Sequence, residues 1–327
     1  MLSPGEQNIL IIRLSSLGDV LLTTPLIRSV KKKYSGITID FLVKKQYSVV
    51  VEKNPYINKV FLLDTADKDW EIDISKYDLI IDLQNNLRSK KLTRDFTKRI
   101  RRFNKHGLDK FLLVNFKCNR LKDLPEIPVR YAETIGEGLP DNEGPDLFFP
   151  DEAVSRVPGD GKTIGLCPGS RHFTKRYPAE RFIDAGNLLA KEGYRIAVFG
   201  GKDERTLCAD IAGKISNCLD LSNENDLFRT AADMKMCKGI ICNDSGLMHV
   251  ACAVGVPVVT IFGSSVREFG FTPYKSRHIL LENKNLKCRP CSHIGKGKCP
   301  KKHFRCMQEI SPEEVYKSIK KLINNNV

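Results

Sequence analysis

Short apolar runs and stretches of helical periodicity alternate along this chain, and this alternation constrains the fold more than any other feature. Within each run, polar and apolar residues do not alternate, which is typical of strands buried on both faces of a parallel sheet. Repeated strand–helix units predict an α/β fold with parallel sheets. We expect strands at 8–14, 37–43, 60–63, 79–83, 163–167, 196–199, 240–242 and 258–262, and helices at 18–34, 179–192, 204–215, 247–254 and 312–323.

Two groups of these units are separated by residues 136–161, a stretch that is rich in glycine and proline and has no long periodic element. A chain of 327 residues is long enough for two domains, since domains average about 100–200 residues. We therefore predict one domain at 1–158 and a second at 159–327, with a cleft between them. In such folds ligands bind at the carboxyl ends of the strands.

The chain carries a large positive surplus, with 53 lysine and arginine residues, 39 aspartate and glutamate residues and a net charge of +14. This surplus favours an anionic partner, such as a nucleic acid, a membrane surface or a phosphorylated ligand. Nine of the cations and a single acid lie at residues 88–105, here called the first basic segment. A solvated helix face is the alternative for this segment, but its charge density favours a surface that faces an anion.

Several classes of protein are disfavoured. Only Phe96 and Phe103 interleave with the cations of the first basic segment, and no recognised motif for binding nucleic acid is present. Residues 239–266 contain no lysine or arginine, but polar residues, glycines and a proline break the run, so it does not predict a membrane span. No signal peptide is expected. The cysteines number 11, an odd count, and seven of them are scattered, which favours a reducing compartment over a disulfide framework.

Two common nucleotide-binding motifs fail when they are tested. Gly161, Lys162 and Thr163 end like a phosphate-binding loop, but Arg156 stands where that loop requires glycine. The segment also precedes a strand, whereas a phosphate-binding loop follows one. No G-x-G-x-x-G follows a predicted strand, so a dinucleotide-dependent dehydrogenase has no support.

The segment RLSSLGDV, residues 13–20, lies where the first strand meets the first helix. Gly18 permits a tight turn there, and Asp19 falls at the start of the helix. Spacing alone favours a helix-capping role for Asp19. A carboxylate at the end of a strand is also suited to accept a proton from a substrate hydroxyl as a general base.

Two further loops between a strand and a helix suit an anion. PGSRHFTKRYP, residues 168–178, brings Lys175 and several other cations to one loop. NDSGLMH, residues 243–249, enters a helix whose free backbone N–H groups and dipole attract anions. Singly, the first could be a solvated loop, Asp244 and Ser245 could be caps, and His249 could be a core histidine. Two such loops in one half of the chain are harder to dismiss.

Four segments together resemble glycosyltransferase family 9, the ADP-heptose:lipopolysaccharide heptosyltransferases. They are RLSSLGDVLLTTPLIRSV, IIDLQNNLRS, PGSRHFTKRYP and NDSGLMHVACAVGVPVVTIFG, in the family's order. The resemblance implies a GT-B fold: two facing Rossmann-like domains with parallel sheets, the first binding the acceptor and the second the nucleotide sugar. It also implies inverting, metal-independent transfer of heptose from ADP-heptose to the inner core of lipopolysaccharide, with a preference for the enzymes that add the second heptose. Another donor sugar or an acceptor outside lipopolysaccharide is the alternative.

The resemblance also implies roles for single residues. Asp19 matches the family's catalytic base, and Lys175 matches the lysine that contacts the donor phosphates. Donor binding is implied for Glu204, Asp244, Ser245, Gly246, Leu247 and His249. Acceptor binding is implied for Ser16, Gly18, Gln84, Asn85 and Arg88.

An anionic glycolipid acceptor, lipid A with Kdo or a phosphorylated inner core, would explain the first basic segment. Such an acceptor lies on the cytoplasmic leaflet of the inner membrane. We therefore expect a cytoplasmic enzyme that associates peripherally with that membrane surface, without insertion, and that takes no nucleic acid as partner.

Four cysteines near the end of the chain form the pattern C-x2-C-x7-C-x6-C: Cys288, Cys291, Cys299 and Cys306. Four cysteines this close could bind structural zinc, with His293 and His303 as further ligands. Free buried thiols and disulfides are the alternatives. No cofactor is expected for catalysis, because nothing in the pattern ties the cluster to the donor loop.

Overall fold

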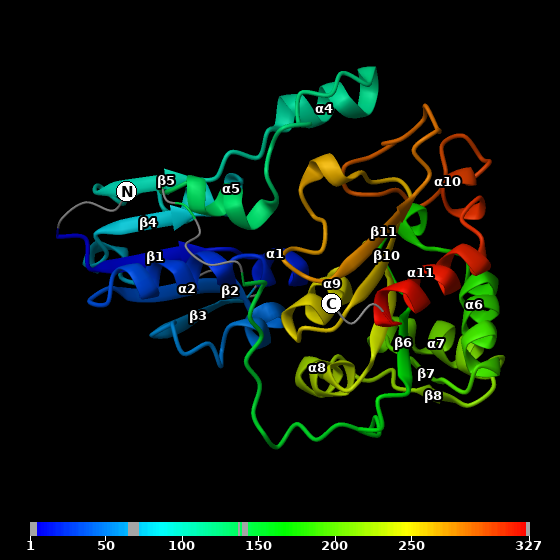
Figure 1. The fold of residues 1–327 in the computed structure, drawn as a ribbon. Helices are drawn as coiled ribbons and strands as arrows, with labels where there is room; N and C mark the ends of the chain where they lie inside the picture. The colour runs from blue at the N-terminus through cyan, green and yellow to red at the C-terminus, as the bar shows by residue number, and fades with distance from the viewer. Residues whose placement is uncertain (1–4, 65–71, 137, 139–142, 325–327) are drawn as a thin grey trace. The chain divides into compact units, whose positions relative to one another are not determined.

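The computed structural model of this chain describes residues 5–64, 72–136, 138 and 143–324. Two separate parallel sheets form its framework, each accompanied by helices (Figure 1). This arrangement confirms the α/β class that the alternating sequence pattern predicts.

The first sheet has five strands in the order β3-β2-β1-β4-β5. Its central strand β1 is parallel to both neighbours, and Ile12 near its carboxyl end lies opposite Leu42 and Asp82. The carboxyl ends of β1 and β4 therefore meet at one edge of the sheet. The strands are β1 Asn8–Ile12, β2 Thr38–Lys44, β3 Lys59–Leu63, β4 Leu79–Asp82 and β5 Arg99–Arg102.

The second sheet has six strands in the order β11-β10-β9-β6-β7-β8. Cys167 at the end of β6 lies opposite Cys242 in β9, so the carboxyl ends of these two strands also meet. The loops that follow them include the two segments predicted to suit an anion. The strands are β6 Thr163–Cys167, β7 Arg195–Val198, β8 Cys218–Asp220, β9 Gly239–Asn243, β10 Val258–Phe262 and β11 His278–Glu282.

The predicted helix at 18–34 is in fact two helices, α1 Leu17–Leu21 and α2 Thr24–Lys33. Pro25 lies in the first turn of α2, where its missing N–H leaves no hydrogen bond unmade, so it helps to begin a helix instead of bending one. The remaining helices are α3 Leu87–Leu92, α4 Gly107–Phe116, α5 Ile127–Glu133, α6 Ala179–Lys191, α7 Arg205–Ala212, α8 Leu227–Lys235, α9 Gly246–Ala253, α10 Arg305–Gln308 and α11 Pro312–Asn324. None of the helices in the described residues is long and apolar enough to cross a bilayer.

Ser311 caps the last helix, because its hydroxyl accepts a hydrogen bond from the Glu314 N–H at 3.1 Å. Helix α11 packs on α6 and against β9, β10 and β11. Close packing explains Gly239 in β9, since a Cβ there would lie 2.8 Å from Ile319 of α11.

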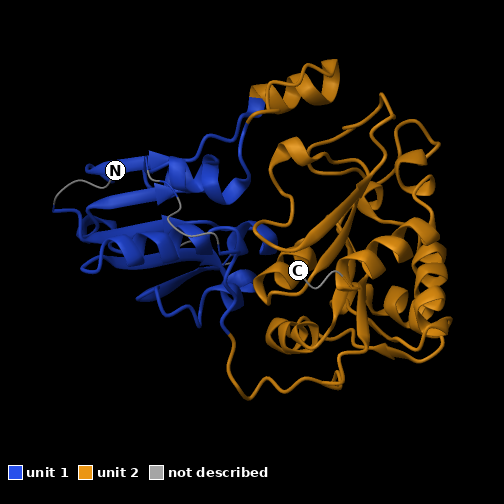
Figure 2. Ribbon diagram, viewed as in Figure 1, with its two compact units in different colours: residues 1–107, 124–148 blue, residues 108–123, 149–327 orange. Residues whose placement is uncertain are grey.

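By its internal contacts the chain divides into two compact units, residues 1–107 with 124–148, and residues 108–123 with 149–327 (Figure 2). Each unit has its own apolar core. Leu10, Ile12, Leu42 and Ile80 belong to the first core, and Ile164, Leu166, Phe182, Ile241 and Ile261 belong to the second. These units are defined by contacts and do not test the predicted domain boundary near residue 158, which stays a prediction.

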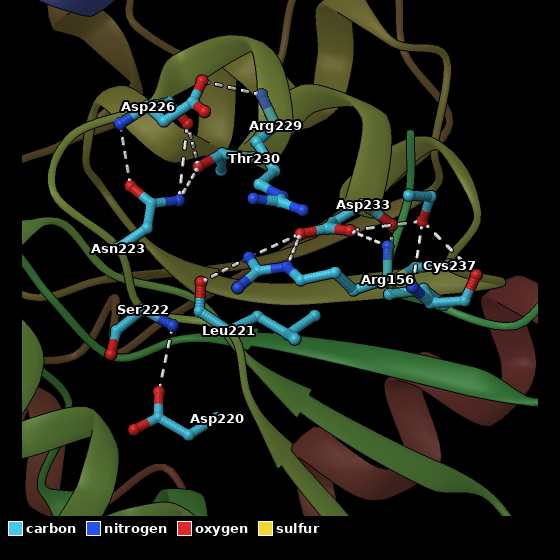
Figure 3. A network of polar contacts seen from close by, with 12 residues as sticks. Arg156, Asp220, Leu221, Ser222, Asn223, Asp226, Arg229, Thr230, Asp233 and Cys237 are labelled. Carbon is cyan, nitrogen blue, oxygen red and sulfur yellow. Dashed lines mark hydrogen bonds and ion pairs between the residues drawn. The ribbon is translucent and has the colours of Figure 1, made fainter. Parts of the chain in front are cut away.

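The chain enters the second sheet through a buried polar network around Asp233 of α8 (Figure 3). Asp233 has no exposed surface and accepts hydrogen bonds from the Arg156 side chain at 2.6 and 2.9 Å. The same carboxylate accepts from the backbone N–H of Arg156 at 2.5 Å and the Ser155 hydroxyl at 3.2 Å. Arg156 also donates to the carbonyl of Leu221 at 3.0 Å. Asp233 thus ties residues 155–156 to α8, and Arg156 ties them to the residue that follows β8.

We expect Asp233→Asn to lower the free energy of unfolding by about 2 kcal/mol, because the amide cannot replace the charge beside the partly buried guanidinium. Urea unfolding followed by circular dichroism measures this. The control is Asp210→Asn, which breaks an exposed pair with Lys214 and should cost less than about 0.5 kcal/mol. Equal losses in the two variants would contradict this account of the network.

Candidate active site

In the first unit, the predicted base Asp19 lies in α1, directly after the carboxyl end of β1. Its Oδ1 pairs with the Arg13 guanidinium at 2.5 Å. Its Oδ2 accepts hydrogen bonds from the N–H of Ser16 at 3.0 Å and from the Ser16 hydroxyl at 2.7 Å. The side chain keeps 17% of its surface exposed. Asp19 therefore closes a capping box with Ser16 and still reaches solvent.

Arg13 is held in place by more than this ion pair. It donates to the carbonyl of Leu83 at 2.7 Å and to that of Ser15 at 2.9 Å, and it lies 5.7 Å from the centre of the Tyr131 ring. Burial acts to lower the pKa of the guanidinium, but the Asp19 carboxylate and other nearby groups raise the pKa above its usual value. A fixed cation thus accompanies the Asp19 carboxylate.

The predicted acceptor residues Ser16, Gly18, Gln84 and Asn85 follow β1 and β4, whose carboxyl ends meet. Gln84 is buried, and its side-chain oxygen accepts from the N–H of Leu14 at 2.9 Å and of Ser15 at 3.3 Å. Asn85 donates to the carbonyl of Phe103 at 2.9 Å, while its buried Oδ1 has no hydrogen-bond partner among the described residues. Gly18 is buried in α1, and Arg88 is exposed on α3.

The sequence analysis missed Lys105 as a single site residue, because it was counted only within the first basic segment. Burial lowers the pKa of Lys105, and the charge of Arg13 lowers it further, while Asp82 and Asp19 act in the opposite direction. These influences place Lys105 beside Arg13, Asp19 and Asp82. In its protonated form, this lysine would help to hold an anionic ligand beside the candidate base.

In the second unit, the two predicted anion-binding loops meet at an ion pair between Lys175 and Asp244. Lys175 Nζ lies 2.7 Å from Asp244 Oδ2, and the same oxygen accepts from the Ser265 hydroxyl at 2.5 Å. Burial acts to raise the pKa of Asp244, but Lys175 and Ser265, with His249 nearby, lower it below the usual value. Asp244 is thus a carboxylate that fixes Lys175.

Helix α9 begins beside this pair. Ser245 is its N-cap residue, but its hydroxyl makes no capping bond and is buried with no hydrogen-bond partner among the described residues. Gly246 and Leu247 form the first turn, whose N–H groups have no partner within the helix. His249 is buried one turn further on. An unused hydroxyl and free N–H groups next to a lysine are suited to bind phosphate.

Glu204 lies against the same loop. A Cβ on Gly169 would come within 1.8 Å of its Oε1, so the carboxyl packs directly on the loop backbone at Gly169. Burial raises the pKa of Glu204, although the Gly201 N–H donates to it at 3.2 Å. The structure therefore brings Glu204 to the loop that carries Lys175.

Arg289 is a second residue that the sequence analysis did not assign to the site. It is buried and donates to the carbonyls of Gly263, Phe262 and Ser265 at 2.6, 3.2 and 2.9 Å. Its charge is balanced by Glu282 at 2.9 Å. Arg289 thus fixes the turn that presents the Ser265 hydroxyl to Asp244. Its position between two cysteines of the C-x2-C pattern hid this role.

The four predicted zinc ligands lie near one another. Burial raises the pKa of Cys306 to about 11, and Cys291, Cys299 and Cys288 add to the shift. Cys288 Sγ lies 3.8 Å from Nε2 of His303. Across the described ranges, however, no three histidine, cysteine, aspartate or glutamate side chains form a group that could hold a metal ion. The zinc site stays a prediction, and no step below depends on it.

Comparison with known proteins places these observations in a family context. A family model described as glycosyltransferase family 9 (heptosyltransferase) matches residues 134–301. Lipooligosaccharide heptosyltransferase 2 of Haemophilus influenzae is 24% identical to this chain, over 97% of the chain and 99% of the relative.

Two solved structures resemble the whole chain. A family 9 glycosyltransferase from Veillonella parvula has a TM-score of 0.79 and 22% identity, covering 98% of each chain. The ADP-heptose lipopolysaccharide heptosyltransferase II of Escherichia coli has a TM-score of 0.72 and 20% identity, covering 97% of this chain and 98% of the other. This likeness confirms the predicted GT-B fold class.

The lowered pKa of Asp244 predicts how stability depends on pH. A group with a lower pKa in the folded state contributes stability that is present above its unfolded pKa of about 3.9 and is lost as pH falls through the folded value. We expect wild type to exceed Asp244→Asn in thermal midpoint by a constant amount above about pH 5, and the gap to shrink below about pH 4.

Thermal unfolding of both proteins across this pH range measures the effect. In a Lys175→Met background the gap should depend less on pH, since Lys175 is a main cause of the lowered pKa. A gap that stays the same through the acid range would show that the ion pair does not set the pKa of Asp244.

Proposed function

The chain belongs to glycosyltransferase family 9, and on that premise we propose that it moves heptose from ADP-heptose to the inner core of lipopolysaccharide, with inversion and without a catalytic metal. The observation that carries this proposal is the group formed by Lys175, Asp244 and the unused Ser245 hydroxyl at the start of α9. This group suits a diphosphate, and the donor named for the similar Escherichia coli structure is ADP-heptose. Full-length similarity to lipooligosaccharide heptosyltransferase 2 supports the choice of sugar and acceptor.

On the donor side, Lys175 and the first turn of α9 would stabilise the negative charge that builds on the departing ADP. Asp244 holds the lysine in place through the ion pair, so little reorganisation is needed during the reaction. Ser245, Gly246, Leu247 and His249 would hold the phosphates, and Glu204 would lie near the ribose. Because this charge stabilisation comes from the protein itself, the proposed reaction needs no metal ion.

On the acceptor side, Asp19 would take the proton from an acceptor hydroxyl as that oxygen attacks the anomeric carbon of the donor. The bond from that carbon to the ADP oxygen breaks on the opposite face, its electron pair leaves with ADP, and the configuration inverts. The centre passes through an oxocarbenium-like state, as in other glycosyl chemistry. A carboxylate has about four lone-pair sites, so the contacts with Arg13 and Ser16 leave room for the acceptor hydroxyl.

The acceptor would be an anionic glycolipid, lipid A with Kdo or a phosphorylated inner core. Ser16, Gly18, Gln84, Asn85 and Arg88 would contact it, with Lys105 as an additional cation. Residues of the first basic segment would face the anionic cytoplasmic surface of the inner membrane, where the enzyme would associate peripherally.

The alternative within the family is another nucleotide-sugar donor or an acceptor outside lipopolysaccharide. Release of ADP from ADP-L-glycero-β-D-manno-heptose, measured with and without inner-core acceptors, separates the cases. Release that depends on the acceptor supports the proposal. A folded protein that releases ADP only from another nucleotide sugar would overturn the proposed donor.

We expect Asp19→Asn to lower kcat by about 100-fold to 10,000-fold, because the amide cannot accept the proton. The amide oxygen can still accept from the Ser16 N–H, but the buried Arg13 guanidinium loses its charge partner, so the melting temperature should fall. ADP binding measured by calorimetry should change little, because the donor residues are untouched. Asp123→Asn, at an exposed carboxylate, serves as the matched control. Loss of ADP binding in step with the loss of transfer would support the capping role alone.

We expect Lys175→Met to lower kcat by about 100-fold to 1,000-fold and to weaken ADP binding, because the leaving diphosphate loses a preorganised cation. Steady-state ADP release and calorimetry measure the two effects. Lys191→Met, at the exposed end of α6, is the matched control. Unchanged kcat in the Lys175 variant would remove this residue from the proposed mechanism.

A further inference from the structure

Helix α4 exposes an apolar stripe that the proposed reaction does not use. Leu108, Phe111 and Phe116 are 67%, 55% and 69% exposed. Leu108 and Phe111 are three residues apart and share one side of the helix, whereas Phe116 and the buried Leu113 lie further round it. The rings of Phe111 and Phe116 contact each other edge to face, with centres 6.0 Å apart. The three side chains therefore form one continuous apolar surface.

A surface of this kind usually marks a place where a protein meets a partner or a membrane. In Figure 2, α4 projects from the rest of its unit. The helix buries Leu113, as an ordinary amphipathic helix buries its apolar residues, but it also turns three large apolar side chains outward. Folding alone therefore does not account for these residues.

A second basic segment, residues 283–308, adjoins α4 within the same unit. It contains eight lysine and arginine residues and no aspartate or glutamate. Lys117, just after α4, donates to the carbonyl of Pro290 at 2.7 Å and to that of Cys288 at 3.4 Å. Lys110 of α4 lies close enough to His293 to lower the pKa of that imidazole, after the larger effect of burial.

Most of the second basic segment's charge faces solvent. Arg289 is buried, whereas the other seven cations are exposed: Lys284, Lys287, Lys296, Lys298, Lys301, Lys302 and Arg305. Ile294, between these cations, is itself 55% exposed. The surface thus combines large apolar side chains with a dense field of positive charge.

We propose that α4 and the second basic segment form a docking surface for an anionic lipid bilayer. Leu108, Phe111 and Phe116 enter the boundary between headgroups and acyl chains, and the lysines face the anionic headgroups. The inference rests on the proposed function in one respect, because a glycolipid acceptor requires the enzyme to work at a membrane. It adds shallow side-chain insertion to the electrostatic association expected from the first basic segment.

The chemistry favours a bilayer over other occupants. A nucleic acid would match the positive charge but not the aliphatic and aromatic stripe. A second copy of the chain would match the stripe but would bring its own eight cations against this segment. An anionic bilayer matches both parts of the surface at once.

The test uses the full chain and vesicles of phosphatidylglycerol and phosphatidylethanolamine, with phosphatidylcholine vesicles for comparison. We expect the combined change of Leu108→Gln, Phe111→Gln and Phe116→Gln to lower the partition coefficient onto anionic vesicles by about tenfold or more. The matched control combines Leu62→Gln and Val154→Gln, at apolar side chains that are 50% and 69% exposed elsewhere, and should bind like wild type. Equal binding of the α4 variant and wild type would overturn the proposal.

A second measurement does not depend on the triple variant folding well. Trp70 is the only tryptophan, so a Trp70→Phe background allows a single new reporter. Emission from Phe111→Trp should shift to the blue when anionic vesicles are added, whereas Val154→Trp should not shift. An unshifted Phe111→Trp spectrum in vesicle-bound protein would place α4 outside the bilayer and contradict the proposal.

An activity assay separates this proposal from the proposed function. With a deacylated, soluble inner-core acceptor, the triple variant should release ADP as fast as wild type, because the site itself is unchanged. If wild type binds vesicles but transfers heptose to no acceptor, the proposed function is contradicted and the proposed docking surface is not. If wild type transfers heptose normally and the α4 variant binds vesicles as wild type does, the docking surface is contradicted and the proposed function is supported.

Discussion

Parallel pairing of the strands is the constraint on which the rest of this structure depends. A parallel pair requires a crossover connection, so each strand ends in a loop that leads to a helix, and the carboxyl ends of neighbouring strands share one edge. In the first sheet this brings together the loops after β1 and β4, which carry Asp19, Gln84 and Asn85. In the second it brings together the loops after β6, β9 and β10, which carry Lys175, Asp244 and Ser265.

The two units use the same local chemistry at these edges. Asp19 holds the Arg13 guanidinium at 2.5 Å and accepts from a serine hydroxyl at 2.7 Å. Asp244 holds Lys175 at 2.7 Å and accepts from a serine hydroxyl at 2.5 Å. In each case a cation and a hydroxyl contact a buried or partly buried carboxylate. These contacts offset the free-energy cost of removing its charge from water. The units differ in what remains available to a ligand. Asp19 keeps part of its own surface exposed, whereas beside Asp244 the hydroxyl of Ser245 has no partner in the described part of the chain.

The sequence could predict the central strands and the site loops, because long apolar runs and glycine-containing turns are local signals. The strands β5, β8 and β11 escaped prediction. Each lies at a sheet edge, but so does β3, which was predicted because it reads as the apolar run KVFLL. β5 reads RIRR, a run that suggests a charged surface more than a strand. Arg289 was not predicted as a site residue, because its contacts with residues 262–265 depend on the fold and not on neighbouring sequence. In the sequence Lys105 is only one of the nine cations of the first basic segment, because its closeness to Asp19 depends on the fold.

The distribution of charge argues that the positive surplus serves binding and not solubility. The first and second basic segments each carry a surplus of eight, more than the whole chain's net charge of +14 when taken together, so the remainder is slightly acidic. A chain that needed charge only to remain dispersed would spread both signs over its surface. Here one unit carries its surplus on and around the edge strand β5, and the other carries it beside an exposed apolar helix. Lys98, Arg99 and Arg102 of the first segment are paired with acids. Arg289 and Arg305 of the second are paired as well, but none of its six lysines forms an ion pair within the described part of the chain. Since unpaired charge attracts a surface more strongly than paired charge, the second segment is the stronger candidate for holding this enzyme on an anionic layer.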